Sequence, residues 1–260
     1  MQSIYSPGDS LLHRLHPLTK LATAGLILIA TYLLPGALTP LALFCVVLIL
    51  TVVGNVTSSI LITVVKLLLP VTVSLFLIQG ILFPPAGATP LPWSLGPIRL
   101  TYEGLLFAYL ISIRLLVLST TVLLVLRTTH PADLVSALTE RGLPRSVAYI
   151  LLVSLQIVPD MTARASAILE AQRSRGLETE RGFFKVRAIV PLLGPLVVGA
   201  LVDVEERAMA LESRAYTAPG PKTSLRELVD TPAQRVARWL IVLALAALII
   251  GRIVIAFQWY

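Results

Sequence analysis

Five apolar segments constrain this chain more than any other feature of its sequence. Three of them reach the roughly 20 residues that a transmembrane helix needs, and the first two are shorter. They cover residues 21–34, 41–54, 60–83, 102–126 and 236–257. The chain is 56% hydrophobic and only 13% charged, against about 25% charged in soluble domains, so its surface requires lipid as solvent. We therefore expect an all-α membrane protein with about five transmembrane helices, the first retained rather than cleaved as a signal peptide.

Basic residues beside the first segment predict its orientation. Arg14 and Lys20 place the N-terminus in the cytoplasm, because basic side chains within about 15–20 residues of a span favour that side. Five spans then put residues 84–101 outside, residues 127–235 inside and the C-terminus outside. The predicted regions are four N-terminal spans at 1–127, a cytoplasmic region at 128–235 and a C-terminal transmembrane helix at 236–260.

The segment from 128 to 235 has the composition of a water-facing region with mixed charge. It holds twelve of the fourteen acidic residues and thirteen of the twenty-one basic ones, so its balance is only +1. A polybasic tail for anionic lipid shows one sign of charge, and a nucleic-acid surface shows a net basic face. Neither of these functions fits the segment.

Three helices are expected in this segment, at 131–142, 145–175 and 186–215. Each of the two long ones begins with an apolar half of about fifteen residues, short for a span, and continues with a charged half. We interpret them as helices that lie along or just under the membrane. The alternative is a sixth and a seventh span that form a hairpin. Internal prolines predict kinks in either arrangement, at Pro159, Pro191 and Pro195.

Chemistry typical of an enzyme is missing from the sequence. The chain has no phosphate-binding G-x-x-x-x-G-K-[ST] loop and no H-E-x-x-H motif, and its expected spans hold no pair of carboxylates. His13 and His16 are three residues apart and could share a helical face, which is a weak hint of a metal site. Arg114 lies within a span and needs a local partner. Cys45, in an apolar run, is expected to be a buried small side chain. No cofactor or resident metal is predicted.

Arginines end both long helices of the cytoplasmic segment. The first ends in EAQRSRG, which contains Glu170, Arg173, Ser174, Arg175 and Gly176, and the second in LESRAY, which contains Ser213, Arg214 and Ala215. A single arginine at such a place complements the negative end of its helix. The repetition favours a further role, since the planar guanidinium pairs carboxylates in a bidentate way. The pattern predicts two arginine-bearing ends that dock into acidic sites on a partner.

These motifs resemble those of the transmembrane (T) components of energy-coupling factor (ECF) transporters, the family of EcfT, CbiQ and BioN. LLHRLHPLTKL at 11–21 resembles the N-terminal L-H-R-L-D-P-x-x-K signature, and the two arginine motifs resemble the Ala-Arg-Gly motifs of the family. The sequence departs from the family pattern at four positions. His16 stands for Asp, Ser174 for Ala, Ser213 for Ala, and Ala215 for Gly.

The resemblance implies a non-catalytic subunit of an importer in the prokaryotic cell membrane. Its expected partners are two cytoplasmic ATPases and a substrate-binding S component, which takes up a vitamin or a transition-metal ion. The two long helices would cross as an X, with Arg175 and Arg214 bound to the ATPases. Closure of the ATPases would move these two ends relative to each other, and the helices would transmit the movement to the S component. The alternatives are a membrane scaffold or a permease that works without ATPases.

Overall fold

The computed structural model describes residues 8, 10–82, 101–176, 189–220 and 230–258. The elements in these ranges are helices, as the sequence predicts. Contacts divide the chain into two compact units. The membrane unit comprises the described residues of Gln2–Arg141 and Leu228–Tyr260, and the α7–α9 unit comprises those of Gly142–Glu227.

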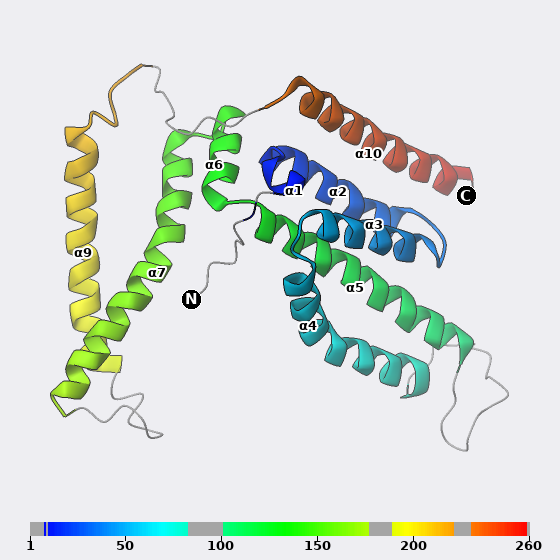
Figure 1. Ribbon diagram of the computed structural model, residues 1–260, viewed down its shortest axis with the longest axis horizontal. Coiled ribbons are helices and arrows are strands. Elements are labelled where there is room, and N and C mark those ends of the chain that lie inside the picture. Colours follow the sequence, from blue (N-terminus) through cyan, green and yellow to red (C-terminus); the bar gives the residue numbers. More distant parts are fainter. Residues whose placement is uncertain (1–7, 9, 83–100, 177–188, 221–229, 259–260) are drawn as a thin grey trace. The chain divides into compact units, whose positions relative to one another are not determined.

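The membrane unit is built around one long central helix, α5 (Tyr102–Thr128), which packs against α2, α3 and α4. The last helix, α10 (Pro232–Gln258), lies along α2 and runs in the same direction (Figure 1). The short helix α6 (Pro131–Glu140) packs against α2 as well. The other elements are α1 (Leu11–Arg14), α2 (Pro17–Leu33), α3 (Thr39–Val53), α4 (Thr57–Leu77) and the π-helical turn η1 (Ile78–Leu82).

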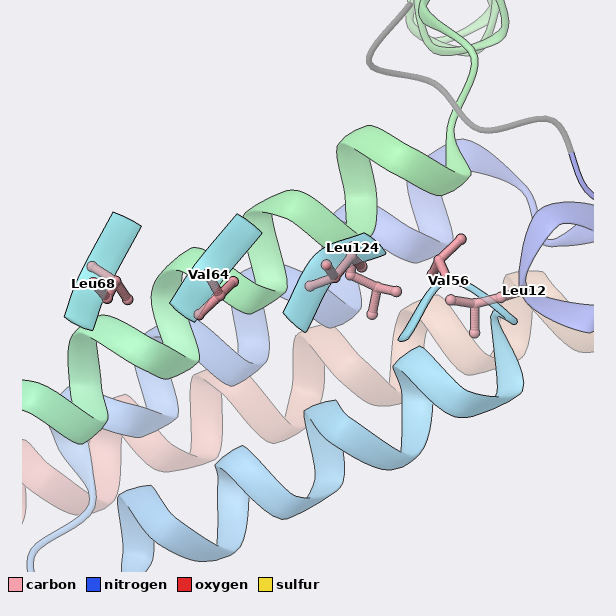
Figure 2. Close-up of a cluster of buried hydrophobic side chains, with 6 residues drawn as sticks. Leu12, Val56, Val64, Leu68 and Leu124 are labelled. Atoms are coloured by element: carbon pink, nitrogen blue, oxygen red, sulfur yellow. The ribbon is translucent and has the colours of Figure 1, made fainter. Parts of the chain in front are cut away.

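A row of aliphatic side chains forms the core of this unit. Ile60, Val64 and Leu68 recur every four residues on α4, so they lie on one face of the helix. Figure 2 shows Val64 and Leu68 pointing toward α5, where Leu124 meets the row. A second cluster joins α2, α3 and α5 around Val47 and Val117, both fully buried. These contacts fix the first four predicted spans as one packed body.

The second half of α4 departs from a regular helix. Pro70 lies inside α4, where it lacks the N–H for the usual i→i−4 bond, and Figure 1 shows α4 bending along its length. The π-helical turn η1 then packs against α5. A Cβ at Gly104 would overlap the carbonyl oxygen of Gln79, so glycine permits this close approach at the start of α5.

Four described helices are long and apolar enough to cross a membrane. Three of them, at Thr57–Gly80, Tyr102–Thr128 and Pro232–Val254, correspond to the long spans that the sequence predicts. The first two predicted spans are the shorter apolar helices α2 and α3. The fourth long helix is α7 (Arg145–Ser174), which the sequence interpretation had placed outside the membrane.

Exposed apolar side chains cover the outer faces of the spans. Among the 18 most apolar consecutive residues of Thr57–Gly80 only 17% are buried, and among those of Pro232–Val254 only 6% are buried. Cys45 belongs to these outward positions on α3, so its expected burial is wrong. Cys45 lies on the outward side of α3, whereas Val47 in the same apolar run lies in the core, and composition alone cannot distinguish these two surroundings.

The α7–α9 unit consists of two long helices that run antiparallel. Helix α7 (Arg145–Ser174) continues through Pro159, and α9 (Ile189–Ser213) continues through Pro195. Both helices agree with the sequence prediction, although the expected start of the second at 186 lies outside the described residues. Contacts between them join early residues of α7 to late residues of α9, and Figure 1 shows the same course.

Candidate functional site

The first arginine motif forms the exposed C-terminal end of α7. Arg175 is the C-cap residue, and its N–H donates to the Gln172 carbonyl at 3.1 Å. Gly176 follows at φ +89°, a left-handed conformation that favours glycine, and its N–H donates to the Arg173 carbonyl at 2.9 Å. The Ser174 hydroxyl donates to the Glu170 carbonyl at 3.1 Å. We call Glu170, Arg173, Ser174, Arg175 and Gly176 the first arginine tip.

The second arginine motif ends α9 with a similar left-handed residue after the C-cap. Ala215 has φ +52°, and its N–H donates to the Glu212 carbonyl at 2.9 Å, while the Tyr216 N–H donates to the Leu211 carbonyl at 3.0 Å. These two bonds form a Schellman motif, in which Arg214 is the C-cap residue. Arg175 and Arg214 therefore occupy equivalent positions. We call Ser213, Arg214 and Ala215 the second arginine tip.

Both tips present their arginine side chains to the surroundings. Arg175 and Arg214 are exposed, and among the described residues no hydrogen bond or ion pair engages either guanidinium group. Backbone N–H groups already cap carbonyls at each helix end, so the side chains remain available. Each guanidinium also lies at the negative end of a helix dipole, which accounts for part of the preference for arginine.

An aromatic contact fixes the second tip beside the start of α7. The Tyr216 hydroxyl donates to the Arg145 carbonyl at 3.2 Å, and its ring lies 5.7 Å from the Tyr149 ring, centroid to centroid. The first tip lies at the other end of α7, 26 residues after Tyr149, or about 40 Å at 1.5 Å per residue. The two tips therefore lie at opposite ends of the unit, a placement that the sequence pattern does not predict.

Two ion pairs set the register between α7 and α9. Arg164 Nη2 lies 2.8 Å from Asp203 Oδ2, and Arg207 Nη2 lies 3.8 Å from Asp160 Oδ2. A Cβ at Gly199 would lie 2.7 Å from Arg164 Nη1, so glycine leaves room for that side chain. The Arg164 and Asp203 side chains are 35% and 28% exposed, and such pairs contribute about 0–1 kcal/mol. These ion pairs favour one alignment of α7 on α9, but they are too weak to prevent the two helices from shifting.

A buried polar network in the membrane unit was not found by sequence reasoning. Arg238 of α10 is 8% exposed, and its Nη2 donates to Asp230 Oδ2 at 2.6 Å. Its Nη1 lies 3.2 Å from His16 Nδ1 and 3.4 Å from Thr19 Oγ1. The backbone N–H of His16 donates to Gln234 Oε1 at 2.9 Å. These bonds join α10 to α2 across 222 residues of sequence, a distance over which no local pattern gives a signal.

His13 and His16 do not share a helical face, which was only a possibility from their spacing. Helix α1 ends at Arg14, Leu15 is extended, and His16 caps α2 by accepting a bond from the Leu18 N–H on Nδ1. Groups of three or more metal-binding side chains are absent from the part of the chain that the structure describes. His16 is instead the partner of Arg238, at the position where the family signature has Asp.

The environment shifts the pKa values of the two groups bound to Arg238. Burial lowers the pKa of His16 from its ordinary 6.5, and the Arg238 guanidinium adds to this, while the Asp230 carboxylate opposes it. The hydrogen bond from Arg238 lowers the pKa of Asp230. A neutral imidazole with its lone pair on Nδ1, shared between the Leu18 N–H and Arg238, suits the observed contact with Arg238, which only donates.

Arg114, the charge within a predicted span, has an aromatic partner. Its guanidinium carbon lies 5.4 Å from the centre of the Tyr32 ring on α2. A cation–π contact of this kind contributes roughly 0.5–2 kcal/mol and reduces the cost of a charge in the membrane. The contact supports a structural role for Arg114.

Comparisons with known proteins agree with the motifs. The family model described as CbiQ, cobalt transport protein, matches residues 8–225. An energy-coupling factor transporter transmembrane protein EcfT of Bacillus subtilis is 32% identical over 237 residues, which cover 87% of this chain and 88% of that protein. The EcfT protein of Thermosediminibacter oceani is 27% identical over 270 residues, which cover 98% and 97%. That of Heliobacterium modesticaldum is 31% identical over 235 residues, which cover 86% and 87%.

Proposed function

Because this chain belongs to the CbiQ family and is the transmembrane component of an energy-coupling factor transporter, we propose that its α7–α9 unit couples two ATPases to a substrate-binding membrane protein. The chain is a multi-pass, non-catalytic subunit of the transporter. This membership replaces the alternatives of a scaffold or a permease without ATPases. The imported micronutrient would be chosen by the S component and not by this chain.

One observation carries the proposal, namely the equivalence of Arg175 and Arg214. Two exposed arginines occupy the same C-cap position, each before a left-handed residue, at opposite ends of one antiparallel pair. Two identical ATPase subunits would offer two identical acidic grooves, and each tip would enter one of them. Bidentate pairing between guanidinium and carboxylate gives arginine an advantage over lysine at both places.

The antiparallel course of α7 and α9 supports a cytoplasmic position for both helices. If they spanned the membrane as a hairpin, the two tips would lie on opposite sides of it, and only one could meet a cytoplasmic ATPase. A span of about 20 residues beginning at Arg145 would also take Asp160 and Arg164 into the hydrocarbon. Insertion of such charges costs about 2.5 kcal/mol or more each. We therefore place α6, α7 and α9 on the cytoplasmic side, with α7 and α9 as the crossing arms of an X.

Movement would pass from the tips to the apolar halves of the arms. The α7 helix from Arg164 to Arg175 and the α9 helix from Arg207 to Arg214 contain no proline, so each is a continuous lever from an ion pair to a tip. Closure of the ATPases would shift the two tips relative to each other. The weak ion pairs permit this shift, and the apolar halves would transmit it to the S component.

Charge reversal at both tips tests the docking. The variant Arg175→Glu with Arg214→Glu should lose co-purification of the ATPases and substrate uptake, while Glu206→Lys, an exposed reversal on α9 away from the tips, should keep both. ATPases that stay bound to the double variant would refute the docking site. Labelling tests the topology. A cysteine at Ser174, in a Cys45→Ala background, should resist a membrane-impermeant maleimide added outside cells, whereas reaction would establish the transmembrane hairpin.

A further inference from the structure

A cavity of about 690 Å³ lies in the membrane unit, where the first turns of α2 and α10 meet the end of α6. Its volume is typical of sites that hold a small molecule. None of the residues that line it belongs to either arginine tip. The cavity is therefore separate from the proposed docking sites of the ATPases. The residues that line it indicate what it binds.

Charged residues line part of the cavity. Arg141, Arg235 and Arg238 line it together with Glu140 and Asp230, so that positive charges exceed negative ones by one. Asp230 accepts from both Arg238, at 2.6 Å, and Arg235, at 3.3 Å, so its charge is already compensated. Arg141 is exposed at the end of α6, and within the described ranges no hydrogen bond or ion pair engages its guanidinium. Donors of Arg141 and Arg235 remain for a ligand.

The other residues that line the cavity are apolar. Leu18 and Ala22 line it from α2, and Trp239 and Val242 line it from α10. Trp239 is 69% exposed at the start of α10, and tryptophan is enriched at the depth of the lipid headgroups. The cavity thus continues from charged groups to aliphatic side chains along two neighbouring spans. A small hydrophilic anion would leave these apolar side chains without a contact.

The position of the cavity along the spans favours a phosphate group. Helices α2 and α10 begin side by side, as the bonds from Arg238 to His16 and Thr19 require, and they run in the same direction (Figure 1). Their positive ends therefore add to the field of the arginines. Basic pockets between spans on the cytoplasmic side recognise lipid headgroups in this way.

We propose that this cavity binds a phospholipid of the cytoplasmic leaflet. Arg141 and Arg235 donate to the headgroup phosphate, and one acyl chain follows Leu18, Ala22 and Val242 into the membrane. Glu140, beside Arg141, accommodates the ammonium group of an ethanolamine headgroup. The bound lipid fills the space between α2, α6 and α10, the three helices that line the cavity.

Native mass spectrometry of the full chain in detergent tests this proposal. The probes are phosphatidylethanolamine, phosphatidylglycerol, a diacylglycerol with the same acyl chains, and inorganic phosphate. The variant Arg141→Gln with Arg235→Gln removes two charged donors and leaves the Arg238 network intact. Arg252→Gln is the matched control, since it changes an exposed arginine near the other end of α10. We expect the native chain to form phospholipid adducts. In the double variant the affinity for phospholipid should fall about tenfold or more, because two hydrogen bonds between charged groups are lost. In the control the affinity should be unchanged.

Several outcomes would overturn the proposal. One is equal retention of phospholipid by the double variant and the chain itself, and another is equal binding of diacylglycerol, which carries no phosphate. Binding of inorganic phosphate without phospholipid would indicate a free-anion site. Loss of the ATPases from the double variant with unchanged lipid adducts would indicate a protein partner. If the double variant does not fold, the single variants Arg141→Gln and Arg235→Gln, each expected to weaken the adduct, replace it.

Discussion

The two units of this protein are held together by different means. The membrane unit has aliphatic positions that are fully buried and a buried hydrogen-bond network around Arg238. In the α7–α9 unit, Ala148 alone is buried among the helix residues whose side chains are described, and partly exposed ion pairs set the register. The membrane unit is therefore stabilised by its own core, whereas the α7–α9 unit depends on partners or lipid to cover its apolar surface.

The largest effect is expected from breaking the buried network of the membrane unit. Arg238→Ala should lower the free energy of unfolding by about 3 kcal/mol, because it removes the buried member of this network and leaves the Asp230 carboxylate with only the exposed Arg235 as its partner. Thermal unfolding in detergent measures the loss. Arg235→Ala removes a side chain that is 63% exposed and contacts the same carboxylate, so it should cost less than about 1 kcal/mol. Equal losses for the two variants would refute the special role of Arg238.

Acid should weaken the same network by a smaller amount. The pKa of His16 is lowered in the folded protein, so between that value and 6.5 the unfolded chain binds more protons than the folded one. Stability from this residue is therefore complete above 6.5 and falls as the pH drops below it. Unfolding midpoints between pH 7.5 and 5 should show the fall in the native chain and a shallower one in His16→Gln. Parallel curves for the two proteins would contradict this assignment.

The two arginine tips should respond in opposite directions to exchange between glycine and alanine. Ala215→Gly should stabilise the second tip by about 1 kcal/mol, because a left-handed residue with a Cβ is strained there. Gly176→Ala should destabilise the first tip by a similar amount. Hydrogen exchange of the last turn of each helix reports both changes. Changes of the same sign would show that the tips are not equivalent.

The smallest effect is expected at the ion pairs between α7 and α9. A double-mutant cycle on Arg164→Ala and Asp203→Ala should give a coupling energy below about 1 kcal/mol, since both side chains are partly exposed. Unfolding of the purified chain provides the values. A coupling above about 2 kcal/mol would mean that the register is locked, and the proposed movement of the tips would then be excluded.

Sequence reasoning predicted the helices because apolar runs and prolines define them locally. The three long spans, the short helix at 131–142 and both arginine tips follow from composition and from residues such as Gly176. The register of α7 on α9 could not be predicted from the sequence. It depends on the ion pair between Arg164 and Asp203, for which Gly199 leaves room. The placement of the tips at opposite ends, which depends on that register, could not be predicted either.

Contacts between distant residues explain the remaining errors. His16 was paired with its neighbour His13, although the chain turns at Leu15 and the true partner, Arg238, lies 222 residues away. Cys45 was expected to be buried, but the outer face of a span is as apolar as its inner face. In a membrane protein, composition locates the spans, and only packing identifies the face that each side chain occupies.

Site-specific crosslinking tests the central claim most directly. Cysteines at Ser174 and Ser213, beside the two arginines, would be introduced singly and together into a Cys45→Ala background, with an exposed control cysteine at Ser154 in the apolar half of α7. The complex with its ATPases would be treated with a short bifunctional reagent. We predict one crosslinked ATPase for each tip, two for the double variant and none for the control. Absence of a crosslink at either tip, or attachment of both tips to one ATPase chain, would contradict the coupling of two ATPases through Arg175 and Arg214.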